Sequence, residues 1–192
     1  MSSSLEKKEF KLWSWAASDC SARLRIALNL KSIPYMLENV DLAKGERAAG
    51  SINPGNTIPT LIISSSDGEQ NMRLTQSLAA LEYLEEAFPE RTPLLPPVGQ
   101  VEARAHVRTL VQIIATDIHP LTTHRVGSWI KTRFVSGGSQ DAAKNEVCEW
   151  DLHWMRRGLA AYEQLVEKSA GKYSVGDSIT MADVCLSTYI VC

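Results

Sequence analysis

The sequence lacks any long hydrophobic run. The opening MSSSLEKKEF has no apolar core of the length found in signal peptides, and no later stretch approaches the length of a membrane span. The sequence also lacks an excess of one charge, since 20 basic residues stand against 22 acidic ones. A balance this close to neutrality offers no broad attraction for nucleic acid or an anionic membrane. We therefore expect a cytoplasmic protein with no nucleic-acid or membrane partner.

Cysteine is scarce and lacks the spacing of a metal site. The four cysteines are Cys20, Cys148, Cys185 and Cys192. Without a secretion signal they are expected to be reduced thiols, and no Cys-x-x-Cys or Cys/His pair has zinc-site spacing. We expect no metal, and we expect Cys148 and Cys185 to be small buried apolar residues.

The first half of the chain alternates between strand and helix patterns. FKLWSW is β-prone, RLRIALNLK places its leucines on one helical face, and YMLENVDL predicts a second strand that the crossover makes parallel to the first. After a polar connection over 45–57, TLIIS and NMRLTQS flank Asp67-Gly68 and predict a hairpin. SLAALEYLEEAF then predicts a helix. This order, β-α-β-(α or loop)-β-β-α, is that of a thioredoxin-like α/β domain over residues 8–90.

A proline-rich segment separates this half from a helical one. Four prolines and a glycine fall close together, which predicts a semi-rigid linker over 91–99. Beyond it, helical periodicity covers 101–118 and 141–171, with a broken stretch between them, and predicts an all-α domain over 100–192. Trp150 and Trp154 lie four residues apart, so they share a helix face and are expected in the core.

The first strand-to-helix turn carries the most chemistry. A helix start favours an anion or a thiolate, because it has free backbone N–H groups and the positive end of the helix dipole. The Ser18 hydroxyl in this turn could donate a hydrogen bond to a bound thiolate, and Cys20 could itself be acidified. The alternative is that Ser18, Asp19 or Ser21 only caps the helix.

Two further segments fit a ligand site. Ile58-Pro59 precedes the third strand, where a proline is poorly placed for a paired position; in a thioredoxin-like domain it is typically cis, and the preceding backbone is offered to a peptide-like ligand. Gln76 and Ser77 stand at a helix start suited to a carboxylate, although Ser77 could simply be the N-cap. Thr180 and Asp183 predict a capping box.

Five motifs in order carry a family resemblance: SDCSARLRIALNLK, NPGNTIPTL, QSLAALEYLEE, IATDIHPL and AGKYSVGDSITMADVCL. From about Phe10 to Leu186 the chain resembles the zeta-class glutathione transferases, the maleylacetoacetate isomerases. The resemblance implies a thioredoxin-like N-terminal domain, an all-α C-terminal domain, glutathione as cofactor and a homodimer. It implies that Ser18 and Cys20 are catalytic and that His119 and Arg125 bind substrate carboxylates. The implied glutathione-binding set is Ser18, Asp19, Cys20, Ser21, Ala22, Arg23, Ile58, Gln76, Ser77, His119, Thr123, His124 and Arg125.

The implied reaction is the isomerisation of maleylacetoacetate, a dicarboxylic diketo acid, to fumarylacetoacetate in tyrosine and phenylalanine breakdown. Asp19 departs from the family pattern, and its charge should raise the pKa of a neighbouring thiol. A general glutathione transferase acting on small halogenated acids, or an inactive paralogue that at most binds glutathione, remain alternatives. Because the family continues beyond MADVCL, the resemblance also predicts a C-terminally short member, truncated or alternatively spliced, with an incomplete second domain.

Overall fold

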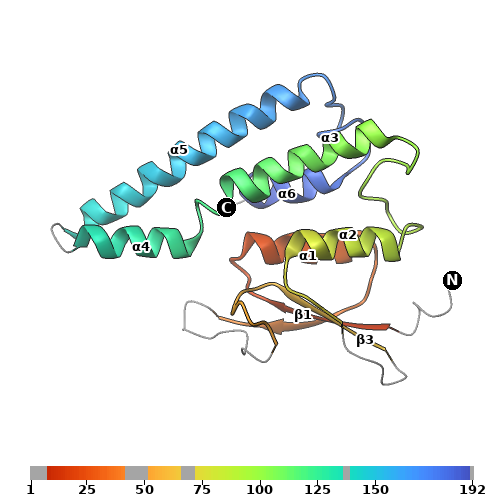
Figure 1. Cartoon of the computed structure of the whole chain (residues 1–192), viewed down its shortest axis with the longest axis horizontal. Helices are drawn as coiled ribbons and strands as arrows, with labels where there is room; N and C mark the ends of the chain where they lie inside the picture. Colours follow the sequence, from red (N-terminus) through yellow and green to blue (C-terminus); the bar gives the residue numbers. More distant parts are fainter. Residues whose placement is uncertain (1–7, 42–51, 66–71, 136–138, 191–192) are drawn as a thin grey trace. The chain divides into compact units, whose positions relative to one another are not determined.

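The structure is a computed structural model that describes residues 8–41, 52–65, 72–135 and 139–190. The chain divides into two compact units, one of Met1–Leu95 with Ser187–Cys192 and one of Pro96–Leu186 (Figure 1). The expected Asp67-Gly68 turn and much of the 45–57 connection lie outside the described residues.

The first unit is built on a four-stranded sheet with the strand order β2-β1-β3-β4. β1 pairs in parallel with β2 and antiparallel with β3, and β3 pairs antiparallel with β4. Figure 1 shows α1 and α2 on the same face of this sheet. The predicted thioredoxin-like arrangement is therefore confirmed. Its elements are β1 (Lys8–Ser14), α1 (Asp19–Leu30), β2 (Met36–Asn39), β3 (Thr60–Ser65), β4 (Met72–Leu74) and α2 (Ser77–Ala87).

The core of this unit lies between the sheet and the two helices. Alternate residues of β1 are buried, among them Leu12, as expected for a strand with one covered face, and Leu61 and Ile63 of β3 are buried as well. Leu24 and Leu28 of α1 are buried on one helical face, as their spacing predicts. Each such side chain contributes roughly 1.5–3 kcal/mol when it is fully buried. This packing fixes where α1 begins relative to the sheet.

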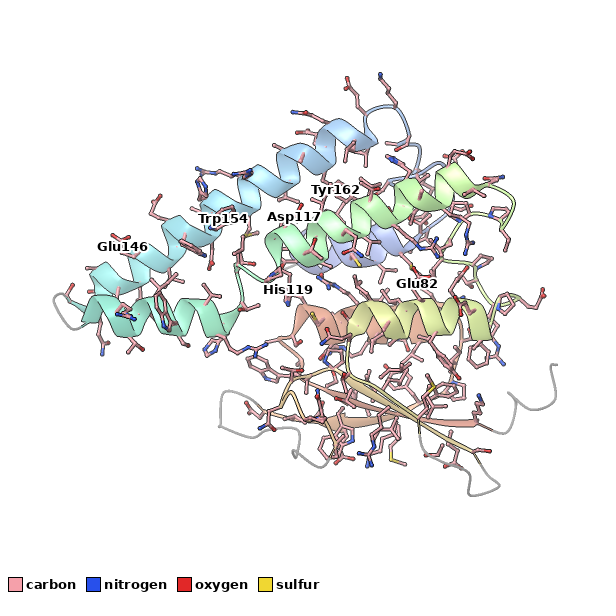
Figure 2. The ribbon with its side chains drawn as sticks, in the orientation of Figure 1. Glu82, Asp117, His119, Glu146, Trp154 and Tyr162 are labelled. Atoms are coloured by element: carbon pink, nitrogen blue, oxygen red, sulfur yellow. The ribbon has the colours of Figure 1, made fainter. Side chains whose placement is uncertain are left out.

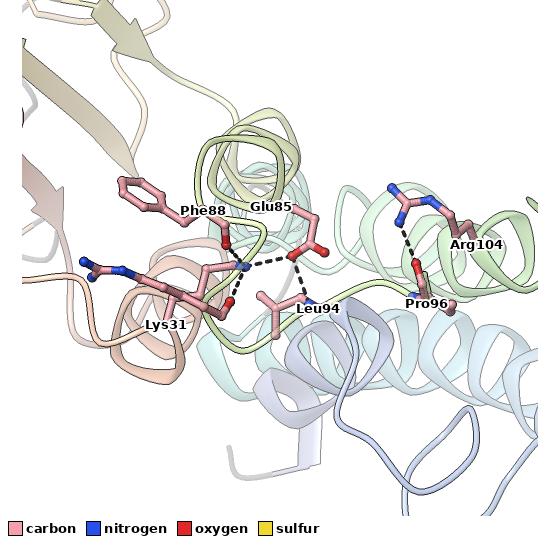
Figure 3. A network of polar contacts seen from close by, with 7 residues as sticks. Lys31, Glu85, Phe88, Leu94, Pro96 and Arg104 are labelled. Carbon is pink, nitrogen blue, oxygen red and sulfur yellow. Dashed lines mark hydrogen bonds and ion pairs between the residues drawn. The ribbon is translucent and has the colours of Figure 1, made fainter. Parts of the chain in front are cut away.

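A buried ion pair ties the ends of α1 and α2 to the segment that follows α2 (Figure 3). The Lys31 ammonium donates to Glu85 Oε2 at 2.8 Å and to the carbonyl oxygens of Phe88 at 3.2 Å and Arg91 at 2.9 Å. The same Glu85 oxygen accepts from the Leu94 backbone N–H at 2.9 Å. The two side chains are only 0% and 8% exposed. Because both charges have partners, the pair is tolerated in the interior.

The second unit is helical, as expected. Two of its helices differ from those that the hydrophobic periodicity predicts. The last six residues of the predicted 101–118 helix form a π-helix, and a regular helix, α4, occupies the stretch expected to be broken. Gly127 allows α4 to approach α5 closely, because a Cβ there would lie 3.2 Å from Val147 on α5. Close packing outweighs glycine's poor helix propensity. The elements are α3 (Val101–Gln112), η3 (Ile113–Ile118), α4 (His124–Val135), α5 (Gln140–Val166) and α6 (Met181–Ile190), of which the residues from Ser187 onward belong to the first unit.

Two expectations about buried residues are wrong. Trp150 is 38% exposed, and Trp154 (Figure 2) is only half-buried, although the two rings do lie 5.7 Å apart on one face of α5. The Trp150 indole N–H donates to the Leu121 carbonyl at 2.8 Å, which places this ring at the polar edge of the helix packing. Cys148 is exposed, whereas Cys185 is fully buried as predicted.

The predicted capping box at the start of α6 is confirmed. Asp183 Oδ2 accepts from the Thr180 backbone N–H at 2.8 Å and from its hydroxyl at 3.0 Å. Asp183 Oδ1 accepts from the Ser174 N–H at 2.8 Å, and the Tyr162 hydroxyl donates to Ser174 Oγ at 2.8 Å. The cluster therefore joins α5, the loop after it and α6, and its role is structural.

The buried Tyr162 should make the protein less stable at alkaline pH. Burial raises the pKa of Tyr162 to about 12 from 10.0, although the Ser174 hydrogen bond opposes the increase. Between these two pH values the unfolded chain releases the proton while the folded chain retains it, so the free energy of unfolding falls by up to roughly 3 kcal/mol. Urea unfolding of Tyr162→Phe across this range should lack that part of the decline. Tyr173→Phe, in the loop that follows α5, should retain it; an equal slope in both variants would contradict the assignment.

Candidate functional site

Strand register brings the three predicted site segments to one end of the sheet. Trp13 near the end of β1 pairs with Thr60 at the start of β3, and Leu61 pairs with Leu74 at the end of β4. The turn after β1, the residues before β3 and the start of α2 therefore follow adjacent strand ends. Sequence spacing predicted each segment separately, and the antiparallel pairing of β3 with both neighbours places them together.

The Ser18 side chain both caps α1 and keeps a donor available. Its Oγ accepts the Ser21 backbone N–H at 3.2 Å, and its backbone is extended, as an N-cap requires. The capping alternative is therefore confirmed, but it does not exclude the other role. A hydroxyl that accepts one hydrogen bond still has its own hydrogen to donate. Ser18 is half-buried at the positive end of the helix dipole.

The residues after Ser18 include one acidic and one basic side chain, Asp19 and Arg23. Asp19 is the first residue of α1 and is half-buried, as are Cys20 and Ala22, whereas Ser21 is fully buried. Arg23 is 1% exposed, and its Nη1 donates to Cys20 Sγ at 3.7 Å. Within the described part of the chain, Arg23 Nε and Nη2 are buried without a hydrogen-bond partner. The turn therefore lies next to a buried positive charge, which favours an anion nearby.

The segment before β3 has the predicted cis peptide bond between Ile58 and Pro59. It is held by Asn53, which sequence reasoning missed. Asn53 Nδ2 donates to the Thr57 carbonyl at 2.7 Å, to the Thr57 hydroxyl at 3.1 Å and to the Thr60 hydroxyl at 3.3 Å. Asn53 is 2% exposed, and Oδ1 accepts the Gly55 N–H at 2.8 Å. The backbone at Ile58 is thus held in place by a neighbouring buried amide.

The start of α2 differs from the simplest expectation. Its N-cap is Gln76, and Ser77 is the first helical residue, so the alternative that Ser77 is the N-cap is wrong. The Gln76 side chain makes no capping hydrogen bond to this N-terminus. Gln76 is exposed and Ser77 is 6% exposed. An uncapped N-terminus of an 11-residue helix retains backbone donors that can bind a carboxylate.

The remaining predicted residues belong to the second unit. His119 (Figure 2) follows η3, and its backbone N–H donates to the Ile114 carbonyl at 3.0 Å. Thr123 precedes α4, and its Oγ1 accepts the Val126 N–H at 3.5 Å. His124 and Arg125 are exposed in the first turn of that helix. These four residues are close in sequence and lie at one helix junction.

Two other kinds of feature are absent from the described ranges. In these ranges, no helix is long and apolar enough to cross a membrane. No group of three or more histidine, cysteine or acidic side chains is placed to hold a metal ion in the part of the chain the structure covers.

Comparison with known proteins identifies the family. The family model of the glutathione S-transferase N-terminal domain matches residues 17–87. Maleylacetoacetate isomerase maiA of Aspergillus fumigatus is 50% identical over 91% of this chain and 73% of its own length. The corresponding Emericella nidulans enzyme is 48% identical over 91% of this chain and 74% of its own length.

Solved structures agree with the sequence relatives. Maleylacetoacetate isomerase from Anaeromyxobacter dehalogenans with bound GSH superposes with a TM-score of 0.82 at 31% identity, covering 96% of this chain and 81% of that one. A bacterial maleyl pyruvate isomerase described as a zeta-class glutathione S-transferase superposes with a TM-score of 0.79 at 34% identity, covering 94% and 81%. The chain therefore belongs to the zeta-class glutathione transferase family, which includes the maleylacetoacetate isomerases.

Proposed function

We propose that this protein is a glutathione-dependent cis–trans isomerase that converts maleylacetoacetate to fumarylacetoacetate in tyrosine and phenylalanine catabolism. The observation that supports this most is the meeting, at one sheet end, of a helix-start hydroxyl, a cis-proline segment and an uncapped helix N-terminus. The hydroxyl can donate a hydrogen bond to a thiolate, the cis-proline segment offers its backbone to a peptide-like ligand, and the helix N-terminus can bind a carboxylate. Glutathione presents a thiol, peptide groups and a γ-glutamyl carboxylate, so its chemistry fits all three.

In the proposed mechanism glutathione is the nucleophile. The Ser18 hydroxyl and the α1 N-terminus stabilise its thiolate, which adds to one carbon of the substrate double bond and leaves the electron pair as an enolate. The former double bond is now single and rotates. The enolate then expels the thiolate, which restores the double bond in the trans form. No proton or electron is consumed overall, and the enzyme contributes thiolate formation, orientation and enolate stabilisation.

The other predicted residues hold the two ligands. Ile58 offers its backbone to the cysteinyl unit of glutathione, and Gln76 and Ser77 bind its γ-glutamyl carboxylate. Arg125 and His119 are proposed to clamp the substrate carboxylates, since a guanidinium matches a carboxylate geometrically. We propose that the remaining residues of the predicted set bind glutathione.

The proposal extends to assembly and location. Residues 8–90 act as the glutathione-binding domain and 100–192 as the helical domain, joined by the 91–99 linker. The protein is proposed to be a cytoplasmic homodimer.

Purified protein assayed with maleylacetoacetate and glutathione tests the proposed reaction. The expected result is a rate well above that of glutathione alone at the same pH. Binding of glutathione with no such rate would overturn the isomerase assignment and favour the alternatives, which a parallel assay with a small halogenated acid separates.

Replacing Asp19 with serine should increase activity. One negative charge within several ångströms of a thiolate disfavours it, so its removal should lower the pKa of the bound glutathione thiol by roughly one unit. At a pH below that pKa, the isomerisation rate should rise several-fold. Asp19→Glu, which keeps the charge, should behave as the parent protein does. An unchanged or lower rate in Asp19→Ser would show that the carboxylate does not act on the thiolate.

A further inference from the structure

Arg25 makes three hydrogen bonds to the residues that lead from β1 into the Ser18 turn. Its Nη1 donates to Ser14 Oγ at 2.6 Å and to the Trp15 carbonyl at 3.0 Å. Its Nη2 donates to the Ala16 carbonyl at 3.1 Å. One guanidinium on the second turn of α1 therefore contacts three consecutive residues, the last of them two positions before Ser18.

This stretch has few other means of holding its shape. Ala16 and Ala17 are exposed and have only methyl side chains, so neither anchors the turn in the core. The Ser18 N–H donates to the Trp15 carbonyl at 3.1 Å, and the Trp15 N–H reaches Ser21 Oγ only at 3.5 Å. The Trp15 carbonyl thus accepts from both Arg25 and Ser18. Moving that carbonyl would move Ser18 with it.

We propose that Arg25 is a positioning residue, which holds the turn so that the Ser18 hydroxyl meets the glutathione thiolate; this rests on the proposed function. Arg25 acts through the backbone of Trp15 and Ala16, not by touching the ligand. A guanidinium suits this task because its rigid planar fork directs several N–H groups at fixed angles. The lysine ammonium is a point charge on a flexible stem and cannot reproduce the fork.

The test measures the pKa of the bound glutathione thiol from the ultraviolet absorbance of its thiolate as a function of pH. Arg25→Met should raise this pKa by about one unit, a tenfold loss of thiolate below the pKa. Arg25→Lys keeps the charge but loses the fork, so it should show most of the same increase. Lys11→Met is the matched control. It also removes one positive charge, but Lys11 lies on β1 and pairs with Glu38, not with the Ser18 turn. The pKa of glutathione bound to Lys11→Met should equal the pKa of glutathione bound to the parent protein.

Amide hydrogen exchange over residues 15–18 gives a second readout, and it should be faster in both Arg25 variants. An unchanged thiol pKa and unchanged exchange in a folded Arg25→Met protein would overturn the inference while leaving the proposed function intact. An Arg25→Lys protein with the parent's thiol pKa would also overturn it, because charge alone would then suffice. A parent protein that does not lower the thiol pKa of glutathione would contradict the proposed function, and the inference would fall with it.

Discussion

Replacing Ser18 with alanine is expected to lower kcat/KM for glutathione-dependent isomerisation by roughly 100-fold, as removal of a single preorganised donor to a developing anion does elsewhere. Steady-state assays at several pH values should show the loss chiefly below the thiol pKa, because the variant forms less thiolate. Ser18→Thr keeps the hydroxyl and should retain most of the activity.

The control for this variant has to separate capping from catalysis. Ser139 caps α5 through the same contact, accepting the Ala142 N–H at 3.2 Å, the distance seen between Ser18 and Ser21. Ser18→Ala and Ser139→Ala should each reduce stability by about 1 kcal/mol. Only the first should reduce activity. If both variants retain activity, Ser18 has no part in the reaction and serves only as a cap.

Replacing Lys31 with methionine is expected to lower the free energy of unfolding by about 3 to 5 kcal/mol, since it leaves a buried carboxylate without its counter-charge. Glu85 would keep only the Leu94 N–H, and the Arg91 carbonyl would lose the Lys31 donor, whereas the Phe88 carbonyl would still accept the Arg91 N–H at 3.2 Å. The magnitude follows from burial, because both side chains of the pair are almost completely removed from solvent. Urea unfolding followed by circular dichroism measures the change.

A surface pair of the same length provides the comparison. Lys11 and Glu38 also meet at 2.8 Å, but their side chains are 38% and 41% exposed, so Lys11→Met should cost less than about 1 kcal/mol. The double variant Lys31→Met, Glu85→Gln removes both charges and keeps an acceptor for the Leu94 N–H. It should recover a large part of the lost stability. Equal losses in Lys31→Met and Lys11→Met would show that the buried network adds nothing.

Much of the first unit was predictable because its signals are local. A helical face in RLRIALNLK, alternation in the strands and a proline before β3 depend on the chain's own geometry within a few residues. The capping box of Thr180 and Asp183 is equally local, and it forms as predicted. The candidate residues of the first unit were found for the same reason, since helix starts carry recognisable polar residues.

The misses share a different cause. α4 packs on α5, with Gly127 next to Val147, and Trp150 remains 38% exposed on α5. The hydrophobic periodicity of each segment does not predict either feature. Tertiary contact decides both, as it routinely overrides propensity.

The sequence by itself determined the order of strands and helices in the first unit, the cis proline, the residue types of the candidate site and the family. Only the tertiary structure decided which distant groups support that site. Lys31 and Glu85 are 54 residues apart, and Arg25 reaches back 11 residues to Ser14. Such pairs depend on how the helices pack against the sheet, and a hydrogen bond forms only where that packing brings donor and acceptor within about 3 Å. The residues that carry the chemistry have a local signature, whereas those that hold them in place do not.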